Sequence, residues 1–340
     1  LNVPARVGWS DIDLEIARNL AQNTADEPSS KMGAADLKEI LLRRGLLWIS
    51  PRDKQVYCSP AGVLLFSKDP TRIYPQSCVR LLAFPDTERD PKPIDFLDLT
   101  SPIPKALEQA LKFIDKNTRH PMLVKGMRRL RLDEYPIEAL REAIINAMAH
   151  RNYEDATRKI HVEVFADRIE IISPGLLPSG ITLEQVRSGK LLPCSRNPVL
   201  AQGLRLLGLM EELGTGVVRM KRAMQDHGLK APEYSYRDGH FVVAFLGPGK
   251  KIALLNVDRA TPVFEVRPSV IEMLTKNQKA IVHELLEKNQ VQVPELAIAL
   301  HVTEQAVRKD MAKLTKLKLV EKRGAARATY YVLKEQVPLS

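Results

Sequence analysis

The stretch PIEALREAIINAMAHR, residues 136–151, decides how this chain folds. Pro136 suits the first turn of a helix, where its missing N–H leaves no hydrogen bond unmade. Apolar residues recur at helical spacing and form one stripe, which consists of Ile137, Leu140, Ile144 and Met148. At about 100° per residue, a second stripe lies roughly opposite the first and consists of Glu142, Asn146 and His150. The pattern predicts an amphipathic helix with an unusual polar face.

The residue types of this polar stripe distinguish it from an ordinary solvated face. A solvated face favours Glu, Lys and Arg, whereas Asn and His are weaker helix formers by up to ~0.7 kcal/mol relative to Ala. A carboxylate, a carboxamide and an imidazole at i, i+4 and i+8 indicate a metal or phosphate site. On periodicity alone, an ordinary amphipathic helix remains the alternative.

Three later segments extend this pattern into an α+β domain. Residues 159–165 and 168–172 alternate apolar and polar side chains around a two-residue turn, which predicts a β-hairpin. The second arm runs into SPGLLPSG, residues 173–180. Farther along, ELGTGVVRM, residues 212–220, opens another helix with small residues.

The block from about residue 133 to residue 246 resembles the ATP-binding domain of the RecG-related transcriptional regulators. Four ordered motifs carry the resemblance: EALREAIINAMAHRNY, DRIEIISPGLLPSGIT, SRNPVLAQ and LGLMEELGTGVVRMK. Within the first, Glu142-x-x-x-Asn146 is similar to the N-box of the GHKL ATPases (gyrase, Hsp90, histidine kinase, MutL). The resemblance implies an α+β fold that contains a GHKL-like (Bergerat-type) α/β sandwich.

The resemblance also implies a site for ATP and Mg²⁺. Asn146 would ligate the metal together with Glu142, since hard cations prefer oxygen ligands, and Glu142 would activate the attacking water. His150 lies on the same stripe and is a further candidate for nucleotide binding. The phosphates would bind at the start of a later helix, at Gly214, Thr215 and Gly216. The glycines there would let the backbone approach the phosphates closely, and the first N–H groups of the helix would be free to bind them.

The base side of the expected pocket departs from the GHKL pattern. There an aspartate opens the first glycine motif, Asp-x-Gly-x-Gly, and recognises adenine. Ser173 stands at this position here, and Gly175 and Gly180 would line the same side. A serine hydroxyl can accept a hydrogen bond from the adenine amino group, but without the charge that strengthens it. Weakened, altered or lost nucleotide binding therefore stays open.

We expect four regions: an N-terminal helical and strand segment (1–125), a GHKL-like ATP-binding domain (126–248), a linker (249–267) and a winged helix (268–335). In the first region, residues 34–47 read as a helix, and residues 63–66 and 79–84 read as strands. Related proteins often begin with a Schlafen/AlbA-type domain. No full one is expected here, although Arg6-Val7-Gly8 resembles its tail.

The C-terminal region has the texture of a winged helix-turn-helix that binds double-stranded DNA. Helical patterns cover residues 269–288, 294–300 and 303–318, and a basic, strand-like stretch follows. From residue 305 to residue 330, eight Lys and Arg stand against two acids. The expected readers of base edges are Thr303, Gln305 and Arg308. The expected phosphate contacts are Lys309, Lys313, Arg323 and Arg327. A protein-interaction module is the alternative.

Composition supports this interpretation. The formal charge of +10 favours a polyanionic partner. The three cysteines, Cys58, Cys78 and Cys194, match no zinc or disulfide spacing, which fits a reducing cytoplasm. No run approaches the ~18 apolar residues that span a bilayer, so no membrane partner is expected.

The sequence thus predicts a nucleotide-responsive transcriptional regulator that binds DNA as a homodimer or higher oligomer. One alternative is a slow ATPase that acts in DNA repair or processing. Another is a degenerate ATPase fold that serves as a dimerisation scaffold. A helicase motor is not expected, because the chain lacks the Gly-x-x-x-x-Gly-Lys-Ser/Thr phosphate loop.

Overall fold

The computed structural model divides the chain into two units, and each is described by itself. Unit 1 comprises Leu1–Arg119 and Glu134–Leu255, and unit 2 comprises His120–Asp133 and Asn256–Ser340. Within the described residues the fold is α+β, with helices and several separate sheets, as the sequence predicted. The described residues are 7–23, 33–178, 180–190, 194–211, 214–324 and 329–334.

Unit 1 is built on a six-stranded sheet in the order β4-β3-β7-β8-β10-β9. β3 and β7 are parallel, and every other neighbouring pair is antiparallel. The hairpin expected over residues 159–172 is confirmed as β7 and β8. The strands are β3 (Val79–Ala83), β4 (Asp95–Leu99), β7 (Ile160–Val164), β8 (Arg168–Pro174), β9 (Glu233–Arg237) and β10 (His240–Leu246).

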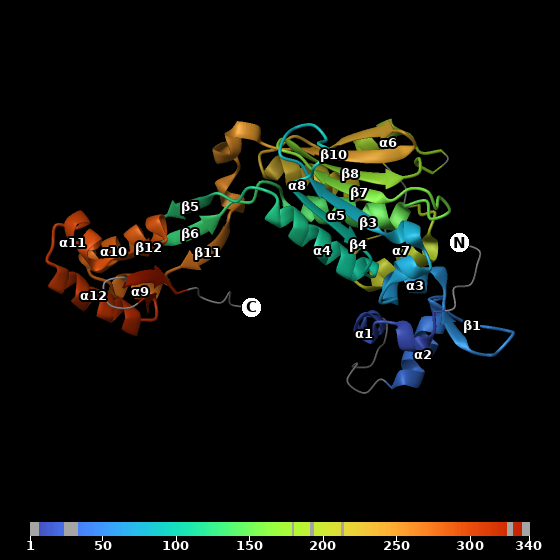
Figure 1. The fold of residues 1–340 in the computed structure, drawn as a ribbon, viewed down its shortest axis with the longest axis horizontal. Helices are drawn as coiled ribbons and strands as arrows, with labels where there is room; N and C mark the ends of the chain where they lie inside the picture. The colour runs from blue at the N-terminus through green and yellow to red at the C-terminus, as the bar shows by residue number, and fades with distance from the viewer. Residues whose placement is uncertain are drawn as a thin grey trace. The chain divides into compact units, whose positions relative to one another are not determined.

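Three helices pack side by side on one face of this sheet (Figure 1). The strand register places Val162, Ile171 and Val243 next to one another, and all three side chains are buried. The helices are α4 (Ile103–Lys116), α5 (Ile137–His150) and α8 (Gly216–Asp226).

Helix α5 is the helix predicted from residues 136–151. Leu140, Ile144 and Met148 are buried, whereas Ile137 is 47% exposed, so the buried stripe begins one turn into the helix. The chain beyond α5 is held by Arg151, which is fully buried. Its guanidinium donates hydrogen bonds of 2.5–2.8 Å to three backbone carbonyl oxygens, those of Asn152, Asp155 and Arg158.

The remaining elements of unit 1 flank this core. Two are α6 (Leu183–Ser188) and α7 (Pro198–Leu206). The N-terminal part contributes α1 (Leu14–Gln22), α2 (Ala34–Arg43), β1 (Leu47–Ile49), β2 (Val56–Cys58) and α3 (Pro60–Phe66).

The strand predicted for residues 63–66 is wrong, because these residues belong to α3. The Ser59 hydroxyl accepts a hydrogen bond from the Gly62 N–H at 3.2 Å, and Pro60 occupies the first helical position. A Cβ on Gly62 would lie 2.0 Å from the Leu46 carbonyl oxygen, so only glycine permits this approach. The run is apolar all round because the helix is buried on every side. The strand expected over residues 79–84 is confirmed as β3.

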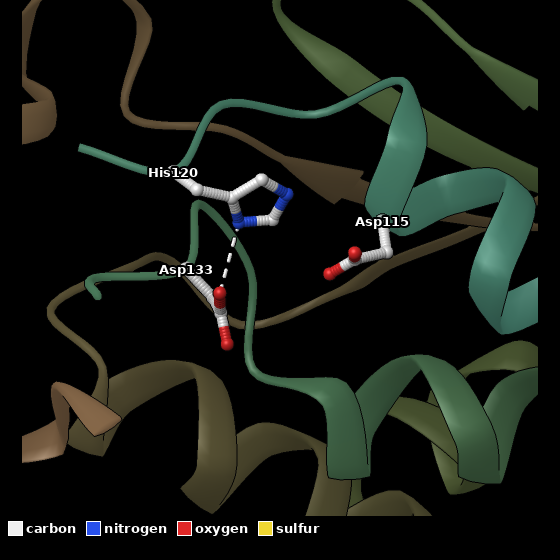
Figure 2. A group of neighbouring side chains, drawn as sticks. All are labelled: Asp115, His120 and Asp133. Carbon is white, nitrogen blue, oxygen red and sulfur yellow. Dashed lines mark hydrogen bonds and ion pairs between the residues drawn. The ribbon is translucent and has the colours of Figure 1, made fainter. Parts of the chain in front are cut away.

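Unit 2 contains a hairpin that the sequence analysis missed. β5 (Met122–Lys125) and β6 (Arg128–Arg131) are inserted between α4 and α5. β6 also pairs with β11 (Thr261–Glu265), which gives the sheet β11-β6-β5. Residues 249–267, expected to be a linker, thus contain a strand of this sheet. At the base of the hairpin, His120 Nδ1 lies 2.8 Å from Asp133 Oδ1 (Figure 2). The third residue labelled in Figure 2, Asp115, belongs to unit 1.

The rest of unit 2 is the predicted helix-turn-helix with a small sheet in the order β12-β14-β13. Thr303 caps α12, and its hydroxyl accepts a hydrogen bond from the Ala306 N–H at 3.3 Å. Phe264 and Val266 belong to the same hydrophobic core as the buried residues of the helices. The elements are α9 (Pro268–Met273), α10 (Lys276–Lys288), β12 (Gln290–Val291), α11 (Val293–Ala299), α12 (Glu304–Lys316), β13 (Val320–Arg323) and β14 (Tyr330–Leu333).

Among the helices of the described residues, none is both long enough and apolar enough to cross a bilayer.

Candidate functional site

The polar stripe of α5 faces a cavity in unit 1 and not the solvent. The cavity has a volume of about 440 Å³, within the usual range for small-molecule sites. Glu142, Asn146 and His150 all line it, together with Ser173 on β8 and Tyr234 on β9.

Glu142 is the most highly connected side chain of the cavity wall. Its Oε1 accepts a hydrogen bond of 3.0 Å from Asn146 Nδ2. Its Oε2 forms an ion pair of 2.7 Å with the guanidinium of Arg219, on α8. The same guanidinium lies 2.5 Å from a carboxylate oxygen of Glu211. Two carboxylates and one carboxamide of the cavity wall are thus linked to the guanidinium of Arg219, which is not itself among the described lining residues.

The start of α8 lies against this cluster. A Cβ on Gly216 would lie 2.1 Å from Glu142 Oε1, so this carboxylate oxygen lies against the backbone at the start of α8. Thr215 is the N-cap residue, and no side-chain cap is seen for α8 among the described residues. The first N–H groups of a helix lack intrahelical partners, and its N-terminus favours negative charge. The geometry is therefore suited to an anionic group.

The cavity wall also carries the serine that was expected to meet a base. Ser173 is buried, and its hydroxyl donates a hydrogen bond of 3.2 Å to the Ala147 carbonyl oxygen on α5. Gly175 lines the cavity beside Arg196, which donates a hydrogen bond to the Leu176 carbonyl oxygen. The hydroxyl proton of Ser173 is thus used within the protein, while its oxygen can still accept a hydrogen bond.

Two further side chains of the wall have altered acid–base properties. Burial, and then the positive charge of Arg196, lower the pKa of His150 to about 4. Burial, and then the negative charge of Glu142, raise the pKa of Tyr234. The Tyr234 hydroxyl is buried and has no hydrogen-bond partner within the described part of the chain. Both groups are neutral at pH 7, and the tyrosine hydroxyl can bond to a ligand.

The structure gathers most of the nucleotide-site residues that the sequence singled out. Gly180 and Thr215 lie outside the set of described residues that line the cavity. Sequence reasoning missed Arg219, Glu211 and Tyr234, although Arg219 follows Gly216 by only three positions in GTGVVR. The residues that do line the cavity are Glu142, Asn146, His150, Ser173, Gly175, Gly214 and Gly216.

On α12, the residues expected to contact DNA share an exposed face. Gln305, Lys309 and Lys313 are exposed, whereas Val307, Met311 and Leu314 on the other face are buried. Arg308 is exposed and pairs with Glu304 at 2.8 Å. Such exposed i,i+4 pairs contribute only about 0.3–0.5 kcal/mol, so the pair can open to release Arg308.

One of the two expected wing contacts, Arg323, lies on β13. Arg323 is exposed, and its Nε lies 3.7 Å from a carboxylate oxygen of Glu321. Arg327, the other expected phosphate contact, lies outside the described residues.

Comparisons with known proteins agree with a two-part chain. Residues 157–245 match the family described as "Putative ATP-dependent DNA helicase recG C-terminal". Residues 278–329 match the family described as "DeoR-like helix-turn-helix domain". The first match begins beyond α5, so Glu142 and Asn146 precede it. No curated protein matches the chain.

One solved structure shares the fold. The DIP2311 protein from Corynebacterium diphtheriae matches 98% of this chain with a TM-score of 0.56 and 20% sequence identity. This chain covers 64% of that protein's chain, which is less than two thirds of its length. An identity this low shows the fold alone. The two family matches thus describe a chain in which an ATPase-like region, similar to the RecG C-terminal family, is followed by a DeoR-like helix-turn-helix domain.

Proposed function

We propose that this protein is a nucleotide-responsive, DNA-binding transcriptional regulator. In this proposal, a GHKL-like domain in unit 1 binds ATP and Mg²⁺, and the occupied domain controls a C-terminal winged helix. The observation that carries the proposal is the cavity where Glu142 and Asn146 meet the start of α8. The family match to a DeoR-like helix-turn-helix supports DNA as the partner.

The residues of the cavity fit a nucleotide with its metal. Asn146 uses Nδ2 for its bond to Glu142 and not Oδ1, the atom that would ligate a cation. Asn146 and Glu142 would hold Mg²⁺, whose chemistry is to neutralise phosphate charge. The start of α8 would receive phosphate, and the unpartnered Tyr234 hydroxyl offers a further bond. Glu142 would accept a proton from the attacking water if hydrolysis takes place.

The helix-turn-helix would contact DNA through the exposed face of α12. Gln305 and Arg308 lie near its N-terminal end, the part of a recognition helix that reaches base edges. Lys309 and Lys313 continue along the same face toward phosphates. The hairpin of β13 and β14 would act as the wing. Nucleotide can change DNA binding only if it has different affinities for the two states of the protein, through domain arrangement or dimerisation.

The test measures DNA affinity by fluorescence anisotropy on a duplex selected from random sequences, with and without ATP–Mg²⁺. Wild-type protein should change its affinity by about fivefold or more, the usual range of allosteric coupling. Asn146→Ala should lose the nucleotide effect and magnesium-dependent ATP binding, but keep its nucleotide-free DNA affinity. Gln109→Ala removes an exposed carboxamide from α4 and is the control. Identical wild-type DNA affinity with and without ATP–Mg²⁺ would refute nucleotide control.

A degenerate ATPase fold used as a dimerisation scaffold is the second candidate. The observation in its favour is Ser173, which replaces the expected carboxylate and already donates to Ala147. A thermal-shift series with ATP, ADP and GTP, each with Mg²⁺, separates the two candidates. A shift with any nucleotide supports a nucleotide site, and no shift in a dimeric protein supports the scaffold.

A further inference from the structure

Arg219 occupies an unusual position for a cation. It is the fourth residue of α8, in the first turn of the helix, where the macrodipole favours negative and not positive charge. Its guanidinium is held there by two carboxylates, Glu142 at 2.7 Å and Glu211 at 2.5 Å. Both glutamates line the cavity. Arg219 itself lies outside the set of described residues that line the cavity, and it is joined to the cavity wall through these two glutamates.

The Glu142 carboxylate occupies space that suits a phosphate. Its Oε1 would lie 2.1 Å from a Cβ on Gly216, so it lies against the start of α8. A carboxylate thus lies where the first N–H groups of α8 favour an anion. A guanidinium presents a planar fork of donors that binds carboxylate and phosphate equally well in geometry. Phosphate oxygens can therefore replace carboxylate oxygens on Arg219 without a change in the kind of bond.

A separate observation concerns a polar group that is buried in the cavity wall. Tyr234 is 4% exposed and lines the cavity, yet its hydroxyl has no hydrogen-bond partner among the residues that the structure describes. A buried polar group without a partner costs about 1–3 kcal/mol. A ligand with polar atoms would remove this cost.

We propose that Arg219 binds the terminal phosphate of a nucleoside triphosphate, and that its ion pairs with Glu142 and Glu211 hold the site in the nucleotide-free protein. The inference rests on the proposed nucleotide function and adds a residue that distinguishes triphosphate from diphosphate. The terminal phosphate replaces the two carboxylates on the guanidinium. Glu142 is then released from its ion pair, and Glu211 is freed from α8. A diphosphate lacks this group and leaves the ion pairs in place.

The test is isothermal titration calorimetry of the full chain with ATP–Mg²⁺ and with ADP–Mg²⁺. Wild-type protein should bind ATP more tightly than ADP. Arg219→Ala should weaken ATP binding about 10- to 100-fold, the usual effect of a charge-assisted contact, and change ADP binding less than about twofold. The matched control is Arg222→Ala, on the same helix with a side chain that is 82% exposed. It should leave both affinities unchanged.

A second variant tests the competition without removing the cation. Glu211→Gln keeps Arg219 and removes one of its two anionic partners, so ATP should bind more tightly than to wild type while ADP does not. Glu211 is largely exposed, so this substitution is compatible with folding.

Three outcomes would overturn the inference. If wild type binds nucleotide but Arg219→Ala keeps the wild-type ratio of ATP to ADP affinity, Arg219 does not bind the terminal phosphate. If Glu211→Gln weakens ATP binding, the ion pairs support the site and do not compete with it. If wild type binds neither nucleotide, the nucleotide function itself fails, and the inference fails with it.

Discussion

Helices α5 and α12 have nearly equal lengths and polar stripes of the same period, yet the stripes face different surroundings. On α5, Glu142 and Asn146 bond to each other in the wall of a cavity. On α12, Gln305 and Lys313 are exposed. The spacing of the polar residues shows where the polar face of a helix lies, whereas their residue types indicate whether that face contacts a ligand or the solvent. Short polar groups suit an enclosed ligand, and long cations suit solvent and a polyanion.

The largest expected effect concerns the stability of the turn that follows α5. Arg151→Ala should lower the free energy of unfolding by about 3–5 kcal/mol, because three backbone carbonyl oxygens lose their donor and the fully buried side chain leaves a large cavity. Urea denaturation of the full chain measures this loss. Arg222→Ala, an exposed arginine, should change stability by at most about 0.5 kcal/mol. Equal losses in the two variants would show that the turn after α5 does not depend on Arg151.

A smaller effect concerns pH, because the half-buried side chain of His150 is neutral in the folded chain at pH 7. Its pKa in the folded chain is about 4, against 6.5 for an ordinary histidine. Between these values the unfolded chain binds a proton that the folded chain does not. The free energy of unfolding should therefore fall as pH drops from 6.5 to 4, by up to about 3 kcal/mol. This contribution should be fully present above pH 6.5.

The measurement is urea denaturation of wild type and His150→Phe at several pH values. Other groups titrate in both proteins, so the difference between the two curves isolates His150. A difference that does not vary with pH would mean that His150 is protonated in the folded chain as readily as in the unfolded one.

The smallest expected effects concern DNA binding by the exposed face of α12. Gln305→Ala should cost roughly 1–3 kcal/mol on a preferred duplex and little on others, because a base contact carries sequence information. Lys313→Ala should weaken binding to all duplexes alike and reduce the slope of log affinity against log salt by about 0.9, as one phosphate contact is lost. Fluorescence anisotropy at several salt concentrations separates the two patterns. Identical behaviour of both variants would contradict the division of α12 into base readers and phosphate contacts.

The sequence predicted the elements whose signals are local. The period of residues 136–151 predicted α5, alternation predicted the hairpin of β7 and β8, and the helical pattern of residues 303–318 predicted α12. The run at residues 63–66 misled because an all-apolar stretch of that length suits a buried strand or a buried helix equally well. Only the Ser59 cap and the close approach at Gly62 decide for the helix.

The candidate site was predictable in its residue types but not in its connections. Glu142 and Asn146 lie four positions apart on one helix, so their contact follows from spacing. The ion pair of Glu142 with Arg219 joins residues 77 positions apart, and no local pattern specifies it. The missing partner of the Tyr234 hydroxyl is likewise a property of packing across the sheet. The hairpin of β5 and β6 is short, and β11, its third strand, lies more than a hundred residues away.

The pairing of β6 with β11 has a consequence for how such a protein can be recombined. The chain passes three times between the two units, after Arg119, after Asp133 and after Leu255. Phe264 and Val266 complete the core of the helix-turn-helix, and Val124 and Met127 of the inserted hairpin pack against that core. A gene fusion that transplants only the C-terminal helices would cut through this core. The helix-turn-helix therefore cannot be moved to another protein by itself. A fusion would also have to include the hairpin of β5 and β6, which lies in the sequence between two segments of the ATPase-like unit.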